Sequence, residues 1–282
     1  MKIQEEIIAP SEYLEKLMMS FHEDKKKITI ALDQINSETS NRIKKFIDLA
    51  ANSYSVYVEP TLFEEVERTS SMVCGPSFTS ETFSRPIDSD GNLMFPILQF
   101  NLSWINIVCA RDYEPGLLQL WWSAAKSEHK LRFIPSDQVK ISQVTNIELT
   151  REMISAVQDW GIPDEWMRDE MDSAYVFIQC LPNGITYPEF EDLCREFLEE
   201  NEIDSDYKEL LYKISSGQSY SARNLGALFD LFGNFNSPFD DLGFGGSILS
   251  TGQWCGGMMT ANLYAYQNKE TGKHSFDFDW GR

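Results

Sequence analysis

The side chains with nucleophilic or metal-binding chemistry are few and widely spaced in this 282-residue sequence. There are five cysteines and three histidines, and no two cysteines form the Cys-x-x-Cys pair of zinc ribbons or thioredoxin-like proteins. No His-Glu-x-x-His pair occurs either. A cysteine–histidine dyad, for example Cys255 with His274, would have to be assembled by folding. Scattered cysteines are more often small buried hydrophobic residues, and the sequence favours that interpretation.

A glycine-rich stretch over residues 243–257 is the second place where chemistry is conceivable. Residues 243–247 (GFGGS) are similar to a phosphate-binding loop, whose backbone N–H groups would surround an anion. No Gly-Lys-Ser/Thr follows them, and a dinucleotide site would need a strand before the loop and a helix after it. Nucleotide binding is therefore not expected. A hydrolase-like enzyme that uses this loop with Cys255 or Asp240 stays open as the alternative function.

Carboxylates are abundant, so their spacing must show whether any of them bind a metal. Residues 88–92 (DSDGN) suggest a calcium loop, but an EF-hand with Gly91 at its sixth position would begin at Pro86 and end at Ile97. Neither residue is a ligand, and a tight turn is predicted instead. Asp277 and Asp279 alternate with aromatic residues, which places both on one face of a strand.

The residues expected to contact a partner combine acids with tryptophans. Adjacent tryptophans in a strand point to opposite faces, so one of Trp121 and Trp122 can lie against another layer or at an interface. No catalytic residue or metal ligand is assigned, no cofactor is expected, and an enzyme is the less favoured class. The predicted partner-binding residues are Trp122, Asp240, Asp241, Trp254, Asp277 and Asp279.

Composition restricts the class of protein and of partner. The chain is 42% hydrophobic and 13% aromatic, which suffices for a sizeable core and excludes disorder of the bulk. Acidic residues number 44 and basic residues 24, a formal charge of −20. This charge repels nucleic acid and anionic membranes and attracts basic proteins, although solubility alone would also explain it. We expect a basic protein partner, no nucleic acid and no membrane.

The N-terminus and the cysteines indicate the compartment. Glu5 and Glu6 stand where a secretion signal would be basic and then apolar. No run of about 18 apolar residues suggests a transmembrane helix. The odd, scattered cysteines do not form the dense framework of a secreted domain. These features predict a cytoplasmic protein.

Hydrophobic periodicity predicts an α+β fold in which antiparallel sheets pack with several amphipathic helices. Residues 28–32 fit a strand or the lead-in to a helix, and residues 233–257 look like a long loop. Pro188 suits the first turn of one helix, and Ser205 is the expected cap of the next. The predicted helices cover residues 11–26, 36–51, 150–160, 188–200 and 206–214, and the predicted strands cover residues 55–58, 93–102, 116–122, 131–134, 258–266 and 276–280.

The middle of the chain resembles the YwqG-like family of bacterial domains. The similarity lies in Cys74-Gly75-Pro76, the turn at residues 90–94 (DGNLM), residues 98–102 (LQFNL) and residues 116–120 (GLLQL). In the family, a Gly-Gly-x-Pro segment precedes a glycine-containing turn, a Leu-x-Gln-Ile-Asn strand and a Gly-x-Leu-Gln-Phe-Phe strand. A later Gly-Gly-x-Pro segment has its nearest equivalent in residues 245–248, which lack the proline.

The resemblance implies one α+β domain over residues 1–282 and no known catalytic residues. Its N-terminal part, residues 1–60, would be mainly helical, and residues 61–282 would form a sheet-rich body with helices near residues 150–215. Such domains often stand beside bacterial polymorphic-toxin genes. The resemblance thus implies an immunity protein that binds and neutralises a toxin, and the acidic charge would suit a basic toxin domain.

Overall fold

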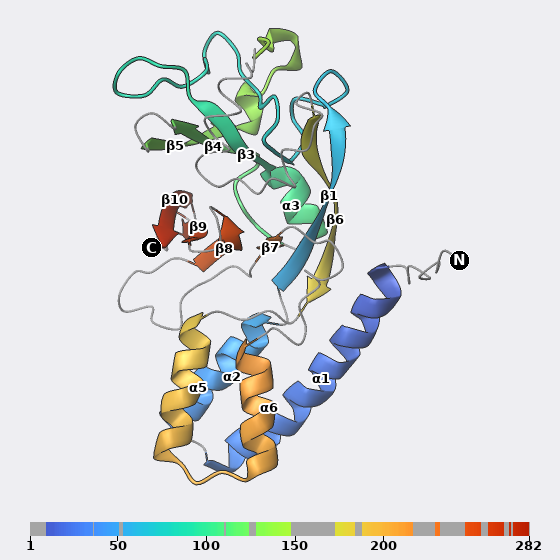
Figure 1. Ribbon diagram of the computed structural model, residues 1–282, viewed down its shortest axis with the longest axis vertical. Helices are drawn as coiled ribbons and strands as arrows, with labels where there is room; N and C mark the ends of the chain where they lie inside the picture. Colours follow the sequence, from blue (N-terminus) through green and yellow to red (C-terminus); the bar gives the residue numbers. More distant parts are fainter. Residues whose placement is uncertain are drawn as a thin grey trace, which may run out of the picture. The chain divides into compact units, whose positions relative to one another are not determined.

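The computed structural model describes residues 10–35, 37–50, 53–109, 111–123, 128–147, 173–183, 188–216, 229–231, 246–254, 259–267, 271 and 273–281. Within these residues the chain is an α+β protein with antiparallel strand pairs, which confirms the predicted fold class (Figure 1). The chain divides into two compact units, one from Met1–Val56 with Cys180–Leu249 and one from Tyr57–Gln179 with Ser250–Arg282. The single domain expected from the sequence stays a prediction.

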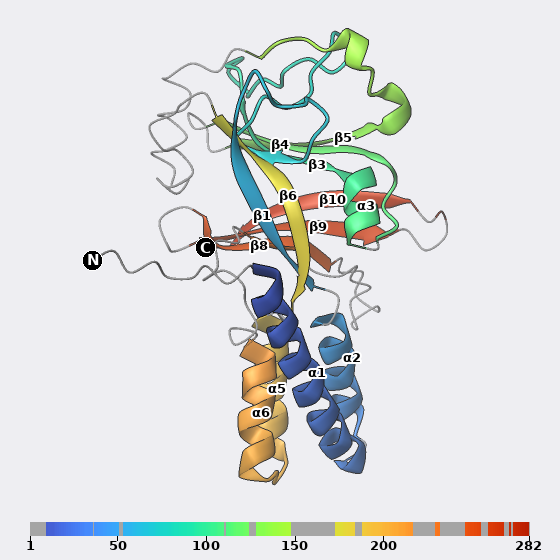
Figure 2. The ribbon, with the colours of Figure 1, turned by 90° about the vertical axis from the view of Figure 1, so that its right-hand side faces the viewer.

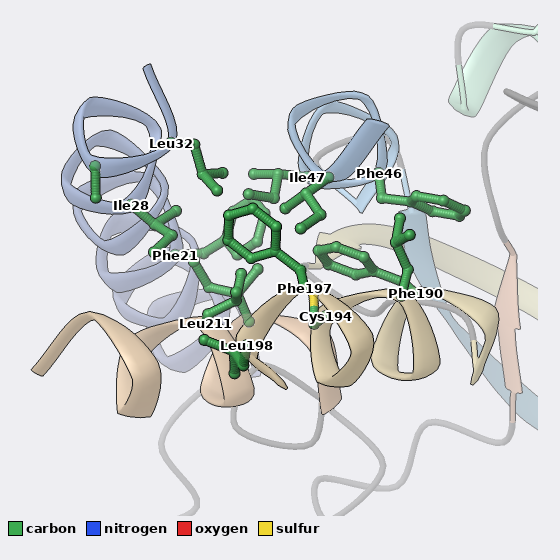
Figure 3. Close-up of a cluster of buried hydrophobic side chains, with 14 residues drawn as sticks. Phe21, Ile28, Leu32, Phe46, Ile47, Phe190, Cys194, Phe197, Leu198 and Leu211 are labelled. Carbon is green, nitrogen blue, oxygen red and sulfur yellow. The ribbon is translucent and has the colours of Figure 1, made fainter. Parts of the chain in front are cut away.

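Four helices from opposite ends of the sequence build the core of the first unit. They are α1 (Pro10–Ile35), α2 (Glu38–Ala50), α5 (Pro188–Glu200) and α6 (Ser205–Ser216). Helix α1 contacts α2 and α6, and α5 contacts the same two helices (Figures 1 and 2). The helices over residues 188–216, which the sequence analysis assigned to the sheet-rich body, therefore pack with the N-terminal helices. Their buried side chains include Phe21, Ile28, Leu32, Phe46, Ile47, Phe190, Phe197 and Leu211 (Figure 3).

Residues 28–32, for which strand and helix were both open, belong to α1. A strand would place Ile28, Ile30 and Leu32 on one face. The structure instead buries Ile28, Ala31 and Leu32 and leaves Ile30 52% exposed. This is the spacing of a helix face, and it extends α1 to Ile35.

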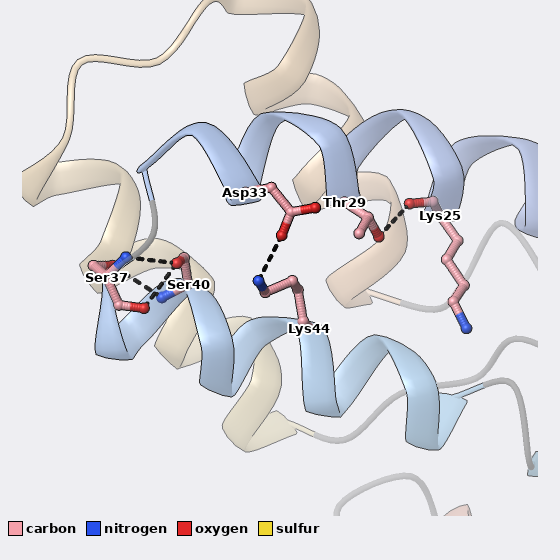
Figure 4. Close-up of polar contacts among 6 residues, drawn as sticks. All are labelled: Lys25, Thr29, Asp33, Ser37, Ser40 and Lys44. Carbon is pink, nitrogen blue, oxygen red and sulfur yellow. Dashed lines mark hydrogen bonds and ion pairs between the residues drawn. The ribbon is translucent and has the colours of Figure 1, made fainter.

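The connection from α1 to α2 is held by paired serines. The Ser40 N–H donates to Ser37 Oγ over 3.0 Å, and the Ser37 N–H donates to Ser40 Oγ over 2.9 Å (Figure 4). The pair satisfies N–H groups that a helix start leaves without partners, as a capping box does. An ion pair of 2.7 Å between Lys44 Nζ and Asp33 Oδ1 joins the two helices.

The second unit contains the predicted antiparallel meander. It consists of β3 (Phe95–Asn101), β4 (Gly116–Ser123) and β5 (Glu128–Pro135), and the short β2 (Met72–Val73) joins β3 to β6 (Ser173–Asn183). The register shifts between Pro96 and Leu98, which confirms the bulge expected at Pro96. The predicted hairpin is also confirmed, because β9 (Met259–Gln267) pairs antiparallel with β10 (His274–Gly281).

Several elements differ from the prediction. Residues 246–254 form the strand β8 (Gly246–Trp254) inside the expected loop, and β6 was missed. Strand β1 (Ser53–Leu62) runs through Pro60, because the φ of proline is compatible with extended backbone. After β3 the chain turns into the helix α3 (Leu102–Val108), whose start is capped by Asn101 Oδ1. Residues 150–160 lie outside the described residues.

The two faces of the meander carry different side chains. Cross-strand pairing places Gln99, Gln119 and Arg132 in one row, and we call this side the glutamine face. The opposite side, the aromatic face, carries Trp122 beside His129 and Leu118 beside Phe133. Phe78 packs on Leu117 and Ile134 of the glutamine face, whereas Phe276 and Phe278 of β10 contact rings of the aromatic face. Each face is thus covered by a different part of the chain.

A substitution at Gly116 tests the close packing of β4 on β5. A Cβ at this position would lie 2.3 Å from the Ile134 carbonyl oxygen, a backbone atom that cannot move aside. We expect Gly116→Ala to lower the free energy of unfolding by about 1–3 kcal/mol, as overpacking does. Urea unfolding measures this, with Glu81→Ala at an exposed position as the control. Equal stabilities of the two variants would contradict the packing described.

Candidate functional site

An irregular but buried segment lies on the glutamine face. Every residue from Ser71 to Ser80 is buried, although regular strand structure ends at Val73. Cys74 has a φ of 51°, and a Cβ on Gly75 would lie 2.6 Å from Ala174 Cβ and from Met72 Sδ. Buried backbone without a strand partner must find other hydrogen bonds.

Two glutamines supply those bonds. Gln99 Oε1 accepts the Phe78 N–H at 2.9 Å, and Gln119 Nε2 donates to the Phe78 carbonyl at 2.8 Å and to Gln99 Oε1 at 2.7 Å. Gln99 Nε2 also donates to the carbonyls of Arg68 and Ser70. Both backbone groups of Phe78 are therefore satisfied by side chains. Because these two glutamines are the ones in the motif strands, the residues that carry the family resemblance have a structural role.

Arg132 completes the row on β5. Its Nε and Nη2 donate to Gln119 Oε1 at 3.0 and 2.7 Å, and its Nη1 donates to the Ser84 carbonyl at 2.7 Å. The guanidinium lies 5.4 Å from the Trp121 ring centroid and 6.0 Å from that of Phe83. Burial lowers the pKa of Arg132 to about 10, so it stays charged at neutral pH. Its polar contacts bind the covering segment to the sheet.

Two buried cysteines, Cys74 and Cys194, are poor nucleophiles. Cys74, Cys109 and Cys194 are free and buried. Burial raises the pKa of the Cys74 thiol to about 12 and also raises the pKa of Cys194. A thiol with a raised pKa holds little of the reactive thiolate near neutral pH. Cys255, the cysteine of the alternative hydrolase, lies outside the described residues.

Metal binding finds no support within the part of the chain that the structure describes. There, no group of three or more His, Cys, Asp or Glu side chains is arranged to hold an ion.

The turn predicted at residues 88–92 is confirmed. The Gly91 N–H donates to the Asp88 carbonyl, and Gly91 has a φ of 87°. Asp88 uses its carboxylate for the turn itself, accepting the N–H groups of Asp90 and Asn92.

The protonation of Asp88 is strongly perturbed. A hydrogen bond of 2.7 Å from Ser123 Oγ lowers its pKa to about 2, assisted by the bonds from Asn92 and Asp90 and opposed by burial. A carboxylate with four donors is fixed as an acceptor, and it has no proton to give near neutral pH. Asp88 therefore holds the turn and is unsuited to acid–base catalysis.

The structure describes the side chains of two of the predicted partner-binding residues, Asp277 and Trp122. Asp277 is exposed on β10, and Asp279 lies two residues further along the same strand, with nothing described of its side chain. Trp122 is 6% exposed; its ring stacks on His129, 6.5 Å away, and the His129 ring meets Phe278 edge-on at 5.2 Å. Trp122 thus lies against another layer, one of the alternatives given for the tryptophan pair.

The structure describes no side chain for the other three predicted residues. Asp240 and Asp241 lie outside the described residues. Trp254 is the last residue of β8, and nothing is described of its side chain. Contact of these six residues with a partner stays a prediction.

A concentration of acids on α5 and α6 was missed in the sequence analysis. Residues 188–216 contain ten acidic and three basic residues, a net charge of −7, whereas residues 10–50 contain seven of each. We call the exposed acids of this helix pair the acidic face. It comprises Glu191, Asp192, Glu196, Glu199, Glu200, Glu202, Asp204, Asp206 and Glu209. A count of charge along the sequence would have found it.

The acids toward the C-terminal end of α5 are arranged against the stability of that helix. Asp192, Glu196 and Glu200 repeat at four-residue spacing, which brings like charges together. Glu199 and Glu200 stand at the C-terminal end of α5, where the helix dipole is negative, and its last turn has no basic residue. Arg195 compensates only Asp192, through an ion pair of 2.5 Å. A local arrangement that costs stability is typical of a functional surface.

Comparison with known proteins gives no family for this chain. No family model matches it, and no curated protein matches it. In the described residues, no helix is both long and apolar enough to cross a membrane. Similarity to the YwqG-like family stays a prediction from the sequence.

A substitution at Gln119 tests whether the glutamine row holds the buried segment on the sheet. We expect Gln119→Leu to lower the free energy of unfolding by at least about 2 kcal/mol, because it leaves the Phe78 carbonyl and the Trp121 N–H without partners. Urea unfolding measures the change, with exposed Gln138→Leu as the control. If both variants lose the same small amount, the row does not hold the segment.

The pH dependence of stability tests whether the charged Asp88 carboxylate holds the turn. Its folded pKa, about 2, lies below the unfolded value of about 3.9, so its charged form stabilises the fold. The contribution is complete above about pH 5 and is lost as the pH falls toward 2. We expect the stability difference between the wild type and Asp88→Asn, measured by urea unfolding, to shrink over this range. A difference independent of pH would contradict the assignment.

Proposed function

We propose that the chain is a non-catalytic acidic binding protein that captures a basic protein. Its resemblance to the YwqG-like family and its acidic charge favour an immunity protein that acts in the cytoplasm and neutralises a bacterial toxin. Two observations on reactive groups support a non-catalytic role. The buried thiols of Cys74 and Cys194 have raised pKa values, and the perturbed carboxylate of Asp88 is occupied in a turn.

The acidic face is the observation that carries the proposal. Its net charge of −7 is confined to 29 residues, and the adjoining helices α1 and α2 are balanced. Charge alone would serve solubility wherever it stood on the surface. Here it stands on one helix pair, and its acids at the C-terminal end of α5 lie at the negative end of the helix dipole, where they cost stability. Complementary charge on a partner would offset that cost on binding.

The acidic face also offers an apolar contact. Tyr212 of α6 is 46% exposed, one helical turn from Glu209. Tyrosine is enriched at the centres of interfaces because its ring buries a large area at low entropic cost. Carboxylates around such a ring would steer a basic partner and set the rate of association. The steering term should weaken as salt screens the charges.

Neutralising the C-terminal part of α5 tests the proposal in two independent ways. We expect the triple variant Glu196→Gln, Glu199→Gln, Glu200→Gln to be more stable, by about 0.3–1 kcal/mol for each unfavourable charge removed near the helix end. We also expect it to capture less of a basic protein from an extract of the source cells at low salt. Urea unfolding and quantitative mass spectrometry of salt eluates measure the two effects.

The matched control neutralises three exposed acids of the other unit, Glu64, Glu65 and Glu81, to glutamine. It changes the net charge equally and should retain the captured protein. Equal losses from both triple variants would mean that overall charge, and no particular face, attracts the partner. Unchanged capture by both would contradict the proposal.

A further inference from the structure

Helix α6 carries an exposed glutamate beside an exposed tyrosine. Glu209 and Tyr212 are three residues apart in the helix, which makes their side chains neighbours on its surface. Both residues are exposed, Tyr212 by 46%. A carboxylate next to an aromatic ring offers a cation two attractive contacts, a charge-assisted hydrogen bond and an approach to the ring face. The pair therefore suits an arginine or lysine side chain.

The sequence of α6 itself supplies a cation that could occupy Glu209. Lys213 follows Glu209 by four residues, and a glutamate four residues before a lysine is the favourable order for an ion pair on a helix. Lys208, the other lysine of α6, directly precedes Glu209 and so points about 100° away around the helix. Local sequence alone therefore predicts a Glu209–Lys213 ion pair.

The structure pairs Lys213 with a different acid. Its Nζ donates to Asp24 Oδ2 of α1 at 2.5 Å, and the Asp24 side chain is only 10% exposed. Within the described residues, Glu209 enters no ion pair. A carboxylate as buried as that of Asp24 is costly to leave without a cation, whereas the exposed Glu209 is hydrated by water. Asp24 is therefore the preferred partner of Lys213.

We propose that Asp24 keeps Lys213 away from Glu209, so that Glu209 and Tyr212 together receive an arginine or lysine side chain of the partner. Asp24 is thus a positioning residue, since it acts through Lys213 and does not touch the partner. The inference rests on the proposed capture of a basic protein, and it adds the place on α6 where one cation of that protein binds.

An NMR titration of the full chain with a hexa-arginine peptide at low salt tests the inference. We expect the amide signals of residues 206–213 to shift as the peptide is added. In Asp24→Asn, Lys213 is released to pair with Glu209, and the peptide must displace it. The apparent dissociation constant read from these signals should then rise about twofold, the strength of an exposed ion pair on a helix.

Three further variants separate this role from a structural one. Asp33→Asn is the matched control, because it also removes an acid of α1 that is paired with a lysine of another helix, and it should keep the wild-type affinity (Figure 4). Asp24→Asn with Lys213→Met keeps the net charge of the wild type and removes the competing lysine, so it should restore the affinity. Glu209→Gln, at an exposed position, should weaken binding whether or not Asp24→Asn folds.

Equal affinities of Asp24→Asn and Asp33→Asn would overturn the inference. So would a loss in Asp24→Asn that Lys213→Met does not reverse, or the wild-type affinity in Glu209→Gln. If the peptide shifts amide signals of α5 but none of α6, this inference fails while the proposed function stands. If it shifts no signal of either helix, both fail.

Discussion

Both backbone groups of Phe78 depend on side chains for their hydrogen bonds, and much of the second unit depends on this contact. The segment from Ser71 to Ser80 is buried, yet it leaves the β-ladder after Val73. An unsatisfied buried backbone group costs about 1–3 kcal/mol, so the segment cannot stay buried unless the sheet beneath it offers donors and acceptors. Gln99 and Gln119 offer both, from adjacent positions on neighbouring strands.

This constraint bears on function as well as on stability. The glutamine face carries polar and charged side chains, a composition that elsewhere would suggest a binding site. Here, Gln119 contacts Phe78, Gln99, Trp121 and Arg132, and Arg132 reaches on to Ser84. The polar groups are committed to the covering segment. The glutamine face therefore does not support the proposed partner binding, and among the described residues acidic charge is concentrated on α5 and α6.

The sequence predicted those elements whose pattern is local. Residues 188–200 show a clean apolar stripe, and β9 and β10 alternate around a turn, so both were found. Strand β8 was missed because glycine and serine dilute its apolar pattern, and its partners come from elsewhere in the chain. For residues 28–32 the sequence left strand and helix open, and only their burial against other helices shows that they are helical.

Site residues were harder to predict for the same physical reason. The glutamines could be seen in the motif strands, but their contact with each other and with Phe78 depends on cross-strand register and on a connection of about 20 residues. The contact of His129, which stacks on Trp122, with Phe278 joins residues that are more than a hundred positions apart. The acidic face needed no tertiary knowledge, only a local count of charge.

Native-state hydrogen exchange at the Phe78 amide tests the central contact most directly. If Gln99 Oε1 holds this N–H as a strand partner would, its protection should equal that of the β3 and β4 amides, and all should exchange through the same unfolding event. Exchange of the Phe78 amide as fast as that of the exposed turn at residues 89–92 would contradict the account, since the segment would then open without disturbing the sheet.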